Sequence, residues 1–422
     1  MIDRIKRIPE LRFSNFYNEW QEKKLGDLGK TYTGLSGKTK TDFGFGDSHF
    51  ITYMNVFKNN IAKFEMTEKV KISNNEKQNK VNYGDIFFTT SSEVPQEVGM
   101  TSIWLFKTNN VYLNSFCFGF RITINNVLPI FLARYLRSEN IRKKITILAQ
   151  GSTRFNLSKK EVMKLSINFP EINEQQKIGD FFSKLDRQIE LEEQKLAKLE
   201  EQKKGYMQKV FSQELRFKDE NGNDYPEWVE ETIPQIIQLI TDYVANGSFA
   251  AIRENVTYSS VEDYAYVIRL QDANANWKGP FVYTNENAYD FLKKTSLFEN
   301  DIIMSNVGTV GKFFKVPKMD KPMTLGPNAL LFRSESNDMN FLYFYLNSKF
   351  FKKKLKRIIT PGVQSKVNKT DLKKIAIKMP KLKEQEKIGD FFSKLDEHIN
   401  KQSQKIGVLK QRKKGFLQKM FV

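Results

Sequence analysis

Two stretches of the chain carry apolar residues at steps of three, four or seven positions. In the first stretch these residues are Ile178, Phe182, Leu185, Ile189, Leu196, Leu199, Tyr206 and Val210. In the second they are Ile388, Phe392, Leu395, Ile399, Ile406, Leu409, Phe416 and Met420. Each row of apolar residues, here called a seam, is interrupted by polar residues at corresponding positions. These are Glu192 and Lys203 in the first seam and Gln402 and Lys413 in the second. Each pattern predicts a helix of about 36 residues, and we expect the two helices to pack together.

The two seams belong to an internal repeat. The string KIGDFFSKLD occupies residues 177–186 and, letter for letter, residues 387–396, which is an offset of 210 positions. The same offset relates Pro170 to Pro380 and the basic residues 142–144 to 352–354. A period of half the chain indicates a duplicated module and not a solenoid of short repeats.

A globular region of mixed pattern precedes each predicted helix. Paired segments predict strands at 50–56 and 266–272, 83–88 and 299–304, and 116–121 and 329–333, and helices at 131–138 and 341–348. Between these elements the sequences differ, as at 89–95 and 305–311. A shared frame with different loops favours two recognition modules, because loops on a rigid frame carry specificity.

The predicted fold class is α+β, with two mixed α/β domains at opposite ends of an antiparallel two-helix coiled coil. The helices are antiparallel because the chain leaves the first domain along one helix and must come back along the other. A pseudo-twofold axis would then relate the halves. We expect the first domain at 1–168, its helix at 169–214, the second domain at 215–378 and its helix at 379–422.

The composition favours a polyanionic partner. The chain has 68 Lys and Arg against 49 Asp and Glu, a formal net charge of +19. Nucleic acid is the first candidate and an acidic membrane surface the second; a merely basic soluble protein is the alternative. The one cysteine, Cys117, lies in an apolar run and is expected in the core, and two histidines, His49 and His398, are too few for a histidine-rich metal site. Without a secretory signal or an apolar run long enough to span a membrane, we expect a cytoplasmic protein and no membrane partner.

The sequence lacks the motifs of common nucleotide-dependent enzymes. Residues 34–39, GLSGKT, resemble a phosphate loop, but Tyr32 stands where its first glycine is required. Lys38 is therefore more simply a loop lysine near DNA phosphate. Neither a G-x-G-x-x-G fingerprint nor the tetrad of amino-methyltransferases occurs. We predict no catalytic residue, no metal ligand and no cofactor in this chain.

Basic clusters and polar loops are the candidates for DNA contact. Lysine and arginine neutralise phosphates, whereas base edges are read by loop Asn, Gln, Ser, Thr and Arg. In the first module the candidates are Lys38, Ser91, Ser92, Arg142, Lys143, Lys144, Ser152, Thr153 and Arg154. In the second they are Asn306, Lys312, Lys352, Lys353, Lys354, Gln364, Ser365 and Lys366.

The arrangement resembles the specificity subunit of type I restriction–modification systems. The resemblance is carried by the repeated motif P-x3-E-Q-x-K-I-G-D-F-F-S-K-L-D from Pro170 and Pro380, and by the turns at 84–86 and 300–302. It implies two target-recognition domains that read the halves of a split, asymmetric DNA site, with the helix pair as spacer. It also implies two modification subunits that bind S-adenosylmethionine and methylate adenine, and two restriction subunits that use ATP and Mg²⁺ to translocate and cut DNA. We expect these partners to contact Lys177, Asp180, Lys184, Lys387, Asp390 and Lys394.

Two other classes of function remain open from the sequence. The first is a non-enzymatic bridging protein, a rod with two interaction heads, against which salt-sensitive binding to duplex DNA would argue. The second is a self-sufficient enzyme, such as a nuclease, with a hidden site. A purified chain that is inert with Mg²⁺ and S-adenosylmethionine would exclude it.

The repeat predicts that the chain is nearly circular. Residues 215–217, LRF, follow the first helix, and residues 11–13 have the same letters at the other end of the chain. We therefore expect the two termini to lie close together and a circular permutant opened near residue 215 to fold. Solubility and circular dichroism of the permutant test this, and an insoluble product would count against it.

Overall fold

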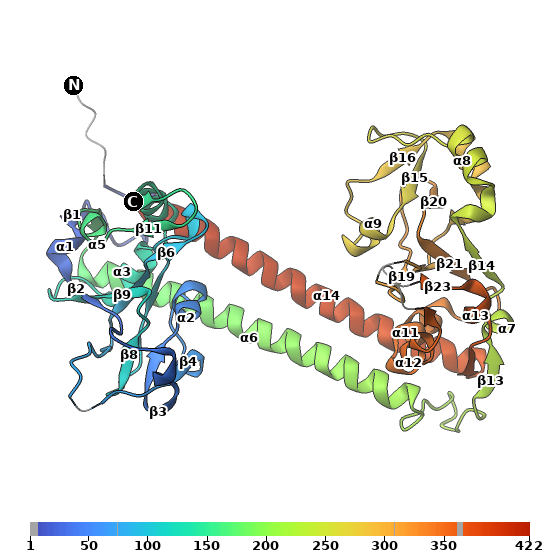
Figure 1. Ribbon diagram of the computed structural model, residues 1–422, viewed down its shortest axis with the longest axis horizontal. Helices are drawn as coiled ribbons and strands as arrows, with labels where there is room; N and C mark the ends of the chain where they lie inside the picture. Colours follow the sequence, from blue (N-terminus) through green and yellow to red (C-terminus); the bar gives the residue numbers. More distant parts are fainter. Residues whose placement is uncertain (1–6, 74, 308, 361–365) are drawn as a thin grey trace. The chain divides into compact units, whose positions relative to one another are not determined.

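The computed structural model describes residues 7–73, 75–307, 309–360 and 366–422 (Figure 1). The chain forms two compact units. The first comprises Met1–Glu193 and Gln404–Val422, and the second Gln194–Ser403. Each unit receives part of both long helices, which are α6, Ile172–Phe211, with 40 residues, and α14, Leu382–Lys419, with 38.

The first unit is a mixed frame of short helices and strands. They are β1 Gln21–Lys24, α1 Leu25–Leu28, β2 Gly29–Thr33, β3 Phe43–Ile51, α2 Tyr53–Lys58, β4 Thr67–Val70, β5 Ile86–Thr89, β6 Ser91–Ser92, β7 Thr101–Ile103, β8 Val111–Leu113, β9 Cys117–Ile122, α3 Pro129–Tyr135, α4 Glu139–Ile147, β10 Ala149–Gln150, β11 Phe155–Leu157, α5 Lys159–Met163 and β12 Ser166–Phe169. Its main sheet has the order β2-β9-β5-β7, and a second sheet, β4-β3-β8, pairs β3 in parallel with β8.

The second unit repeats this frame. Its elements are β13 Val229–Thr232, α7 Ile233–Ile236, β14 Leu239–Asp242, α8 Phe249–Asn255, β15 Ala265–Ile268, α9 Leu270–Asn274, β16 Val282–Thr284, α10 Glu286–Phe291, β17 Ser296–Leu297, β18 Ile302–Ser305, β19 Phe313–Lys315, β20 Met323–Leu325, β21 Ala329–Arg333, α11 Met339–Asn347, α12 Lys349–Lys356, β22 Ile359–Thr360, β23 Lys366–Val367, α13 Lys369–Lys373 and β24 Ala376–Met379. The sheet β14-β21-β18-β19 matches the main sheet of the first unit, and β15 again pairs in parallel with its distant partner β20. The duplicated α+β frame is confirmed.

The predicted helices at 131–138 and 341–348 are α3 and α11, but two predicted strands are wrong in their second halves. Strand β3 ends at Ile51, and the hydroxyl of Thr52 accepts a hydrogen bond from the amide of Asn55 (3.2 Å) to begin α2. Strand β15 ends at Ile268, and the carboxylate of Asp272 accepts from the amide of Arg269 (2.8 Å) at the start of α9. These capping bonds at the helix starts outweigh the strand-like composition.

The long helices run antiparallel in each unit. In the first, Asp186 of α6 forms an ion pair with Lys413 of α14 (2.5 Å), and Glu193 pairs with Lys410 (2.6 Å). In the second, Lys203 of α6 pairs with Asp396 of α14 (2.5 Å). Positions 186 and 396 correspond in the repeat, as do 203 and 413, so the same bond is made twice. The predicted packing of the two helices is confirmed.

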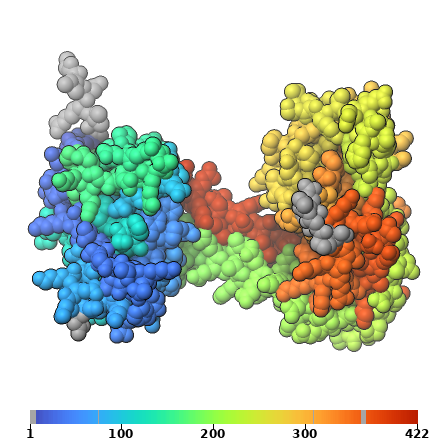
Figure 2. All heavy atoms as spheres, in the orientation of Figure 1, coloured from blue at the N-terminus to red at the C-terminus, as the bar shows by residue number. Residues whose placement is uncertain are grey.

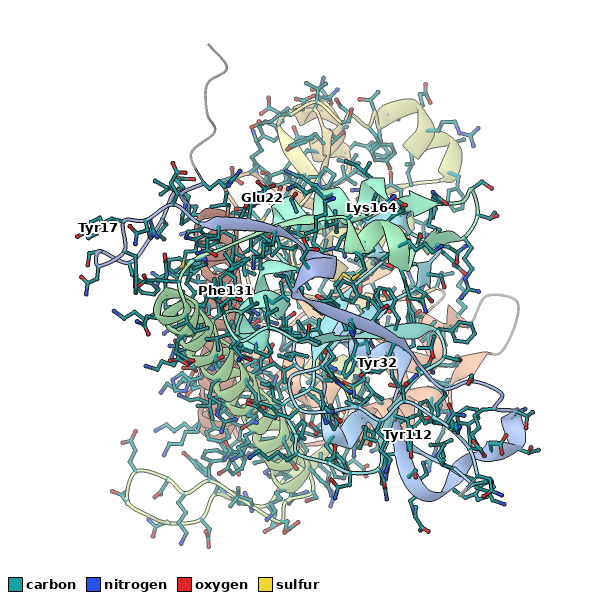
Figure 3. All side chains as sticks on the ribbon, turned by 90° about the vertical axis from the view of Figure 1, so that its left-hand side faces the viewer. Tyr17, Glu22, Tyr32, Tyr112, Phe131 and Lys164 are labelled. Atoms are coloured by element: carbon teal, nitrogen blue, oxygen red, sulfur yellow. The ribbon has the colours of Figure 1, made fainter. Side chains whose placement is uncertain are left out.

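The end of each long helix completes a core that begins elsewhere in the chain. Phe421, just beyond α14, is 3% exposed in the first unit. The centroid of its ring lies 5.7 Å from that of Phe182 and 5.8 Å from that of Phe131, which is labelled in Figure 3. Phe211, at the end of α6, takes the same place in the second unit, 5.7 Å from Phe392. Burial of such a ring contributes about 2 kcal/mol to each core.

The two helix ends lead into matching backbone turns. The amide of Leu11 donates to the carbonyl of Lys419 (2.8 Å), and the amide of Leu215 donates to the carbonyl of Lys209 (3.1 Å). The segment near the N-terminus thus follows α14 in space as residue 215 follows α6 along the chain. This contact confirms the predicted closeness of the N-terminal and C-terminal segments.

The repeated motif around Glu174 has a structural explanation. The guanidinium of Arg12 donates to both carboxylate oxygens of Glu174 at 2.7 Å, and that side chain is 1% exposed. In the second unit Arg216 pairs with Glu384 (2.9 Å), whose carboxylate also accepts from the indole of Trp228 (3.2 Å). A bidentate charged pair of this kind holds one geometry. Each pair fastens the start of a long helix to the segment that follows the end of the other.

The glutamine beside each glutamate fixes the helix that precedes it. The side-chain oxygen of Gln175 accepts from the amide of Leu128 (2.8 Å) at the start of α3, and its amide nitrogen donates to the carbonyl of Pro170 (2.8 Å). Gln385 makes the same two bonds, with Asp338 (3.0 Å) and Pro380 (2.9 Å). The motif therefore satisfies buried backbone groups that would otherwise destabilise the fold.

The turns at 84–86 and 300–302 place a buried aspartate beneath an arginine. Asp85 accepts from two nitrogens of Arg121 at 2.8 and 2.7 Å, and Asp301 from two nitrogens of Arg333 at 2.8 and 2.6 Å. The residue before each aspartate has a positive φ, +86° for the glycine and +72° for the asparagine, which these residue types tolerate best. These turns belong to the frame and not to the loops whose sequences differ between the two halves.

The glycine of KIGD permits the close approach of a long helix to the globular part. A Cβ on Gly179 would lie 2.9 Å from the Cγ2 of Ile130, and one on Gly389 would lie 2.9 Å from the amide nitrogen of Phe341. Both distances are too short for real contacts. The repeated glycines are thus required by packing against α3 and α11.

We expect Glu174→Ala to destabilise the first unit by about 3 kcal/mol, because Arg12 would keep a largely buried charge without its carboxylate. Faster hydrogen exchange of the amides in the first turns of α6 would report this loss. The control is Glu201→Ala, an exposed position of the same helix, where the effect should stay within about 0.5 kcal/mol. Equal exchange in both variants would contradict the structural role of the pair.

Candidate nucleic-acid interface

A small sheet brings two of the predicted loops of the first unit together. Strands β6 and β11 pair antiparallel, so Ser91 and Ser92 lie beside the segment that carries Arg154. Ser152 and Thr153 lie exposed in the bend before Arg154. Five of the candidate residues therefore share one surface, although about 60 positions of sequence separate the two loops.

Arg154 is exposed, but its position is fixed by two contacts. Two of its nitrogens donate to the hydroxyl of Ser91 at 3.3 and 3.2 Å, and that serine is 4% exposed. Its guanidinium carbon lies 5.9 Å from the ring centroid of Phe116, which is 55% exposed. A guanidinium that is held on one side and open on the other can donate to the O6 and N7 atoms of guanine.

A hollow of about 420 Å³ opens beside Arg154. The hydroxyl of Tyr53 donates to the carbonyl of Ser91 (2.7 Å), and the ring of Tyr53 stacks on that of Phe57 at 5.9 Å. Burial raises the pKa of the Tyr53 hydroxyl, so it keeps its proton and remains a donor. The hollow is lined by Tyr53, Met54, Phe57, Ser91, Ser92, Glu93, Val94, Glu97, Phe116 and Arg154.

The lining combines the groups that read base edges in a groove. Arginine and serine hydrogen-bond to bases, carboxylates accept from cytosine, and apolar side chains contact the thymine methyl group. The sequence did not single out Tyr53, Met54, Phe57 or Phe116. Because 50–56 was predicted as one strand, α2 and its exposed face were missed. The available signal was Thr52, which can cap a helix.

Two cations that the sequence proposed for DNA contact are used inside the first unit. Lys38 donates to the carbonyl of Lys71 (2.6 Å) and pairs with Glu76 (2.6 Å), a contact that helps lower the pKa of Glu76 to about 2. Arg142 donates to the carbonyls of Gly99, Val98 and Gln96 at 2.7, 2.6 and 2.8 Å. Burial lowers the pKa of Arg142 to about 10. On helix α4, Lys143 pairs with Glu139 (2.7 Å), and Lys144 is exposed.

The corresponding loops of the second unit also meet. An isolated bridge joins Val307 to Lys366 of β23, so the loop after β18 lies beside the strand that carries Lys366. Asn306, in that loop, has a buried side-chain oxygen without a hydrogen-bond partner among the described residues. Lys312 is exposed, and its ammonium lies 3.4 Å from the side-chain oxygen of Asn274. Gln364 and Ser365 lie outside the described residues.

Helix α12 presents the basic cluster of the second unit. Lys352 and Lys353 are exposed, and partial burial lowers the pKa of Lys352. The ammonium of Lys354 donates to the carbonyl of Ala376 (2.5 Å) and lies 4.0 Å from the carboxylate of Glu230. Lys352 and Lys353 can therefore face a ligand, whereas Lys354 is partly engaged.

The residues expected to contact partners occupy corresponding outer positions of the long helices. Lys177 lies 5.1 Å from the ring centroid of Phe16, and Lys387 lies 5.7 Å from that of Tyr225 and donates to the carbonyl of Lys218 (2.9 Å). The other four, which are exposed, are Asp180, Lys184, Asp390 and Lys394. Because corresponding residues of α6 and α14 lie in similar surroundings, the chain carries this surface in two copies.

The described part of the chain holds no cluster of three His, Cys, Asp or Glu side chains that could bind a metal ion. In that same part, no helix has the length and apolar character needed to cross a membrane. Cys117 is 2% exposed, which confirms its predicted place in the core, and burial raises the pKa of its thiol. His398 is exposed on α14.

Comparison with known proteins finds the same internal repeat. A family model described as "Type I restriction modification DNA specificity domain" matches residues 17–201 and 227–411. The two matches start 210 positions apart, since 227 − 17 = 210, which is the offset of the repeat. The type I restriction enzyme MjaVIII specificity subunit of Methanocaldococcus jannaschii is 22% identical over 429 residues, covering 97% of this chain and 92% of that protein.

Solved structures share the fold at low sequence identity. The S subunit of a type I restriction–modification system from M. genitalium superposes with a TM-score of 0.57 and 16% identity, covering 98% of this chain and 99% of that one. A chain from a structure that addresses complex assembly and conformational transition of the type I R-M system gives a TM-score of 0.58 and 15% identity, covering 95% and 97%. The whole chain, and not one unit, has a counterpart in each.

Proposed function

Because this chain belongs to the family of type I restriction–modification DNA specificity subunits, which recognise DNA and are not themselves catalytic, we propose that each unit reads one half of a bipartite, gapped DNA site. The observation that carries the proposal is one frame built twice with different loops. A buried aspartate pairs with an arginine at the same place in both units, as Asp85–Arg121 and Asp301–Arg333. The loops beside them differ in sequence, so the half-sites differ and the whole site is asymmetric.

The loops that meet in each unit are the proposed base readers. In the first unit they carry Ser91, Ser92, Ser152, Thr153 and Arg154, and in the second Asn306, Lys312, Gln364, Ser365 and Lys366. Tyr53 and Phe116 of the first unit join them, because they line the same hollow as Arg154. Lys144, Lys352 and Lys353 contact phosphates, which gives affinity without sequence information, whereas Lys143 is already paired with Glu139. Lys38 and Arg142 are not carried forward, since their donors serve the fold.

The assembly we propose contains two modification subunits and two restriction subunits. The modification subunits bind S-adenosylmethionine and methylate adenine, and the restriction subunits use ATP and Mg²⁺ to translocate and cut DNA. Duplicated outer positions on the long helices suit two copies of the same partner. The proposed contacts are Lys177, Asp180 and Lys184 on α6 and Lys387, Asp390 and Lys394 on α14. We place this assembly in the cytoplasm, and we propose that the lengths of α6 and α14 set the gap between the half-sites.

The decisive measurement is genome-wide adenine methylation in cells that carry the modification subunit, with and without this chain. We expect a gapped, bipartite methylation motif only when the chain is present, because the modification subunit relies on it for sequence recognition. The motif would give both half-sites at once. If an expressed and active modification subunit gains no motif, the bridging protein becomes the better account.

Arg154 allows one half of the site to be tested alone. We expect Arg154→Ala to relax the methylation motif in one half-site and leave the other unchanged. Loss of a bidentate contact to a base costs about 1–3 kcal/mol of discrimination. The matched variant is Arg154→Lys, which keeps the charge but cannot make two parallel bonds. Full retention of the motif by the lysine variant would mean that Arg154 contacts only phosphate.

A further inference from the structure

Helices α4 and α12 occupy corresponding places in the two units but differ in charge. Residues 349–357, KFFKKKLKR, contain six cationic residues and no acidic one, whereas residues 139–147, ENIRKKITI, contain three cationic residues and one acidic residue. The main sheets of the two units match, so the difference lies in the side chains that a shared frame carries and not in the frame itself. The lysines at 349, 352, 353 and 356 of α12 are exposed.

The charges of α4 are mostly used within the first unit. Arg142 serves three backbone carbonyls, and Lys143 is paired with Glu139. The charges of α12 are mostly not used in this way. Among the described residues, Glu230 is the one acidic side chain that forms an ion pair with this helix, 4.0 Å from Lys354. The exposed cationic residues on or beside α12 that form no such pair within the described ranges are Lys349, Lys352, Lys353, Lys356, Arg357 and Lys378.

Part of this charge surrounds a hollow of about 380 Å³. Its walls carry four cations, Lys353, Lys354, Arg357 and Lys378, against one carboxylate, that of Glu230, together with the rings of Phe211, Trp228, Tyr345 and Phe350. At the positions that correspond to Arg357 and Lys378, the first unit has Ile147 and Asn168. In Figure 2 the orange atoms of this part of the chain form part of the outer surface of the second unit. The hollow is thus an open, cationic feature of one unit.

We propose that this cationic face of α12, with its hollow, is the principal phosphate anchor of the chain on duplex DNA. The inference rests on the proposed function and adds an asymmetry to it: the second unit supplies most of the salt-dependent affinity. Lysine and arginine spaced one helical turn apart, as at 353 and 357, can neutralise successive backbone charges. The first unit depends more on its hollow of aromatic and hydrogen-bonding groups.

The test compares two variants of the full chain, assembled with its modification subunit, that lose the same charge. They are Lys353→Gln with Arg357→Gln on α12, and Lys143→Gln with Lys144→Gln on α4. Binding to a specific duplex and to a scrambled duplex is measured across a series of NaCl concentrations. The slope of log K against log salt is negative, and for two lost phosphate contacts its magnitude should fall by about 1.8 in the α12 variant. In the α4 variant the magnitude should fall by no more than about 0.9, the value for one phosphate contact, because Lys143 is already paired with Glu139.

Each outcome has a separate meaning. The α12 effect should be equal on both duplexes, because phosphate contacts carry no sequence information. The exchange Lys353→Arg with Arg357→Lys, which keeps both charges, should retain the slope and so separates charge loss from misfolding. Equal slopes in the two charge-loss variants would overturn the asymmetry. An unchanged slope with weaker binding of the modification subunit would assign α12 to an acidic protein surface. If the assembly that contains the chain without substitutions does not bind DNA, the proposed function itself fails.

Discussion

A buried carboxylate at the start of each long helix is the interaction on which the rest of the fold depends. Glu174 and Glu384 each hold an arginine from the segment that follows the end of the other long helix. Desolvating such a carboxylate is costly, and the cost is offset only when a cation and further donors meet it in one geometry. The neighbouring glutamine fixes the helix that precedes it, and the aromatic ring at the end of the other long helix lies in the same core. Helix position, core closure and chain direction therefore meet at one contact in each unit.

The frame and the loops proposed to read DNA are stabilised by different residues. Frame contacts use buried side chains that reach groups far apart in sequence, as Gln175 reaches the start of α3 and Asp85 reaches Arg121. The loops follow β5 and β18 and lie beside the hairpins that precede β12 and β24, and they contact one another, as Ser91 contacts Arg154. Their sequences can therefore change without moving the elements that hold them. This separation explains how one duplicated scaffold can present a hydrogen-bonding aromatic hollow in one unit and a cationic helix in the other.

The repeat made much of the fold predictable from the sequence. A seam that recurs with the same polar interruptions identifies two helices and their packing, and the matched pairs Asp186–Lys413 and Asp396–Lys203 are its physical basis. The candidate site was less predictable, because its geometry depends on distant partners. The carbonyls that occupy Arg142 lie more than 40 positions away. A basic triplet in a sequence does not reveal which of its members face solvent. The turn from β3 into α2 depends on one capping bond of Thr52, which outweighs an apolar, strand-like composition.

The exchange of helix ends also has a consequence for biosynthesis. The core of the first unit includes Phe421 and the stretch 404–422, which the ribosome makes 211 positions after residue 193, since 404 − 193 = 211. At bacterial elongation rates this delay lasts about 10 to 40 s. During it, the first unit exposes the apolar surface that the end of α14 later covers. The second unit, whose parts are contiguous at 194–403, can close before the first. The half of the chain that is translated first is therefore completed last, and part of its apolar core surface stays uncovered until the final residues are made.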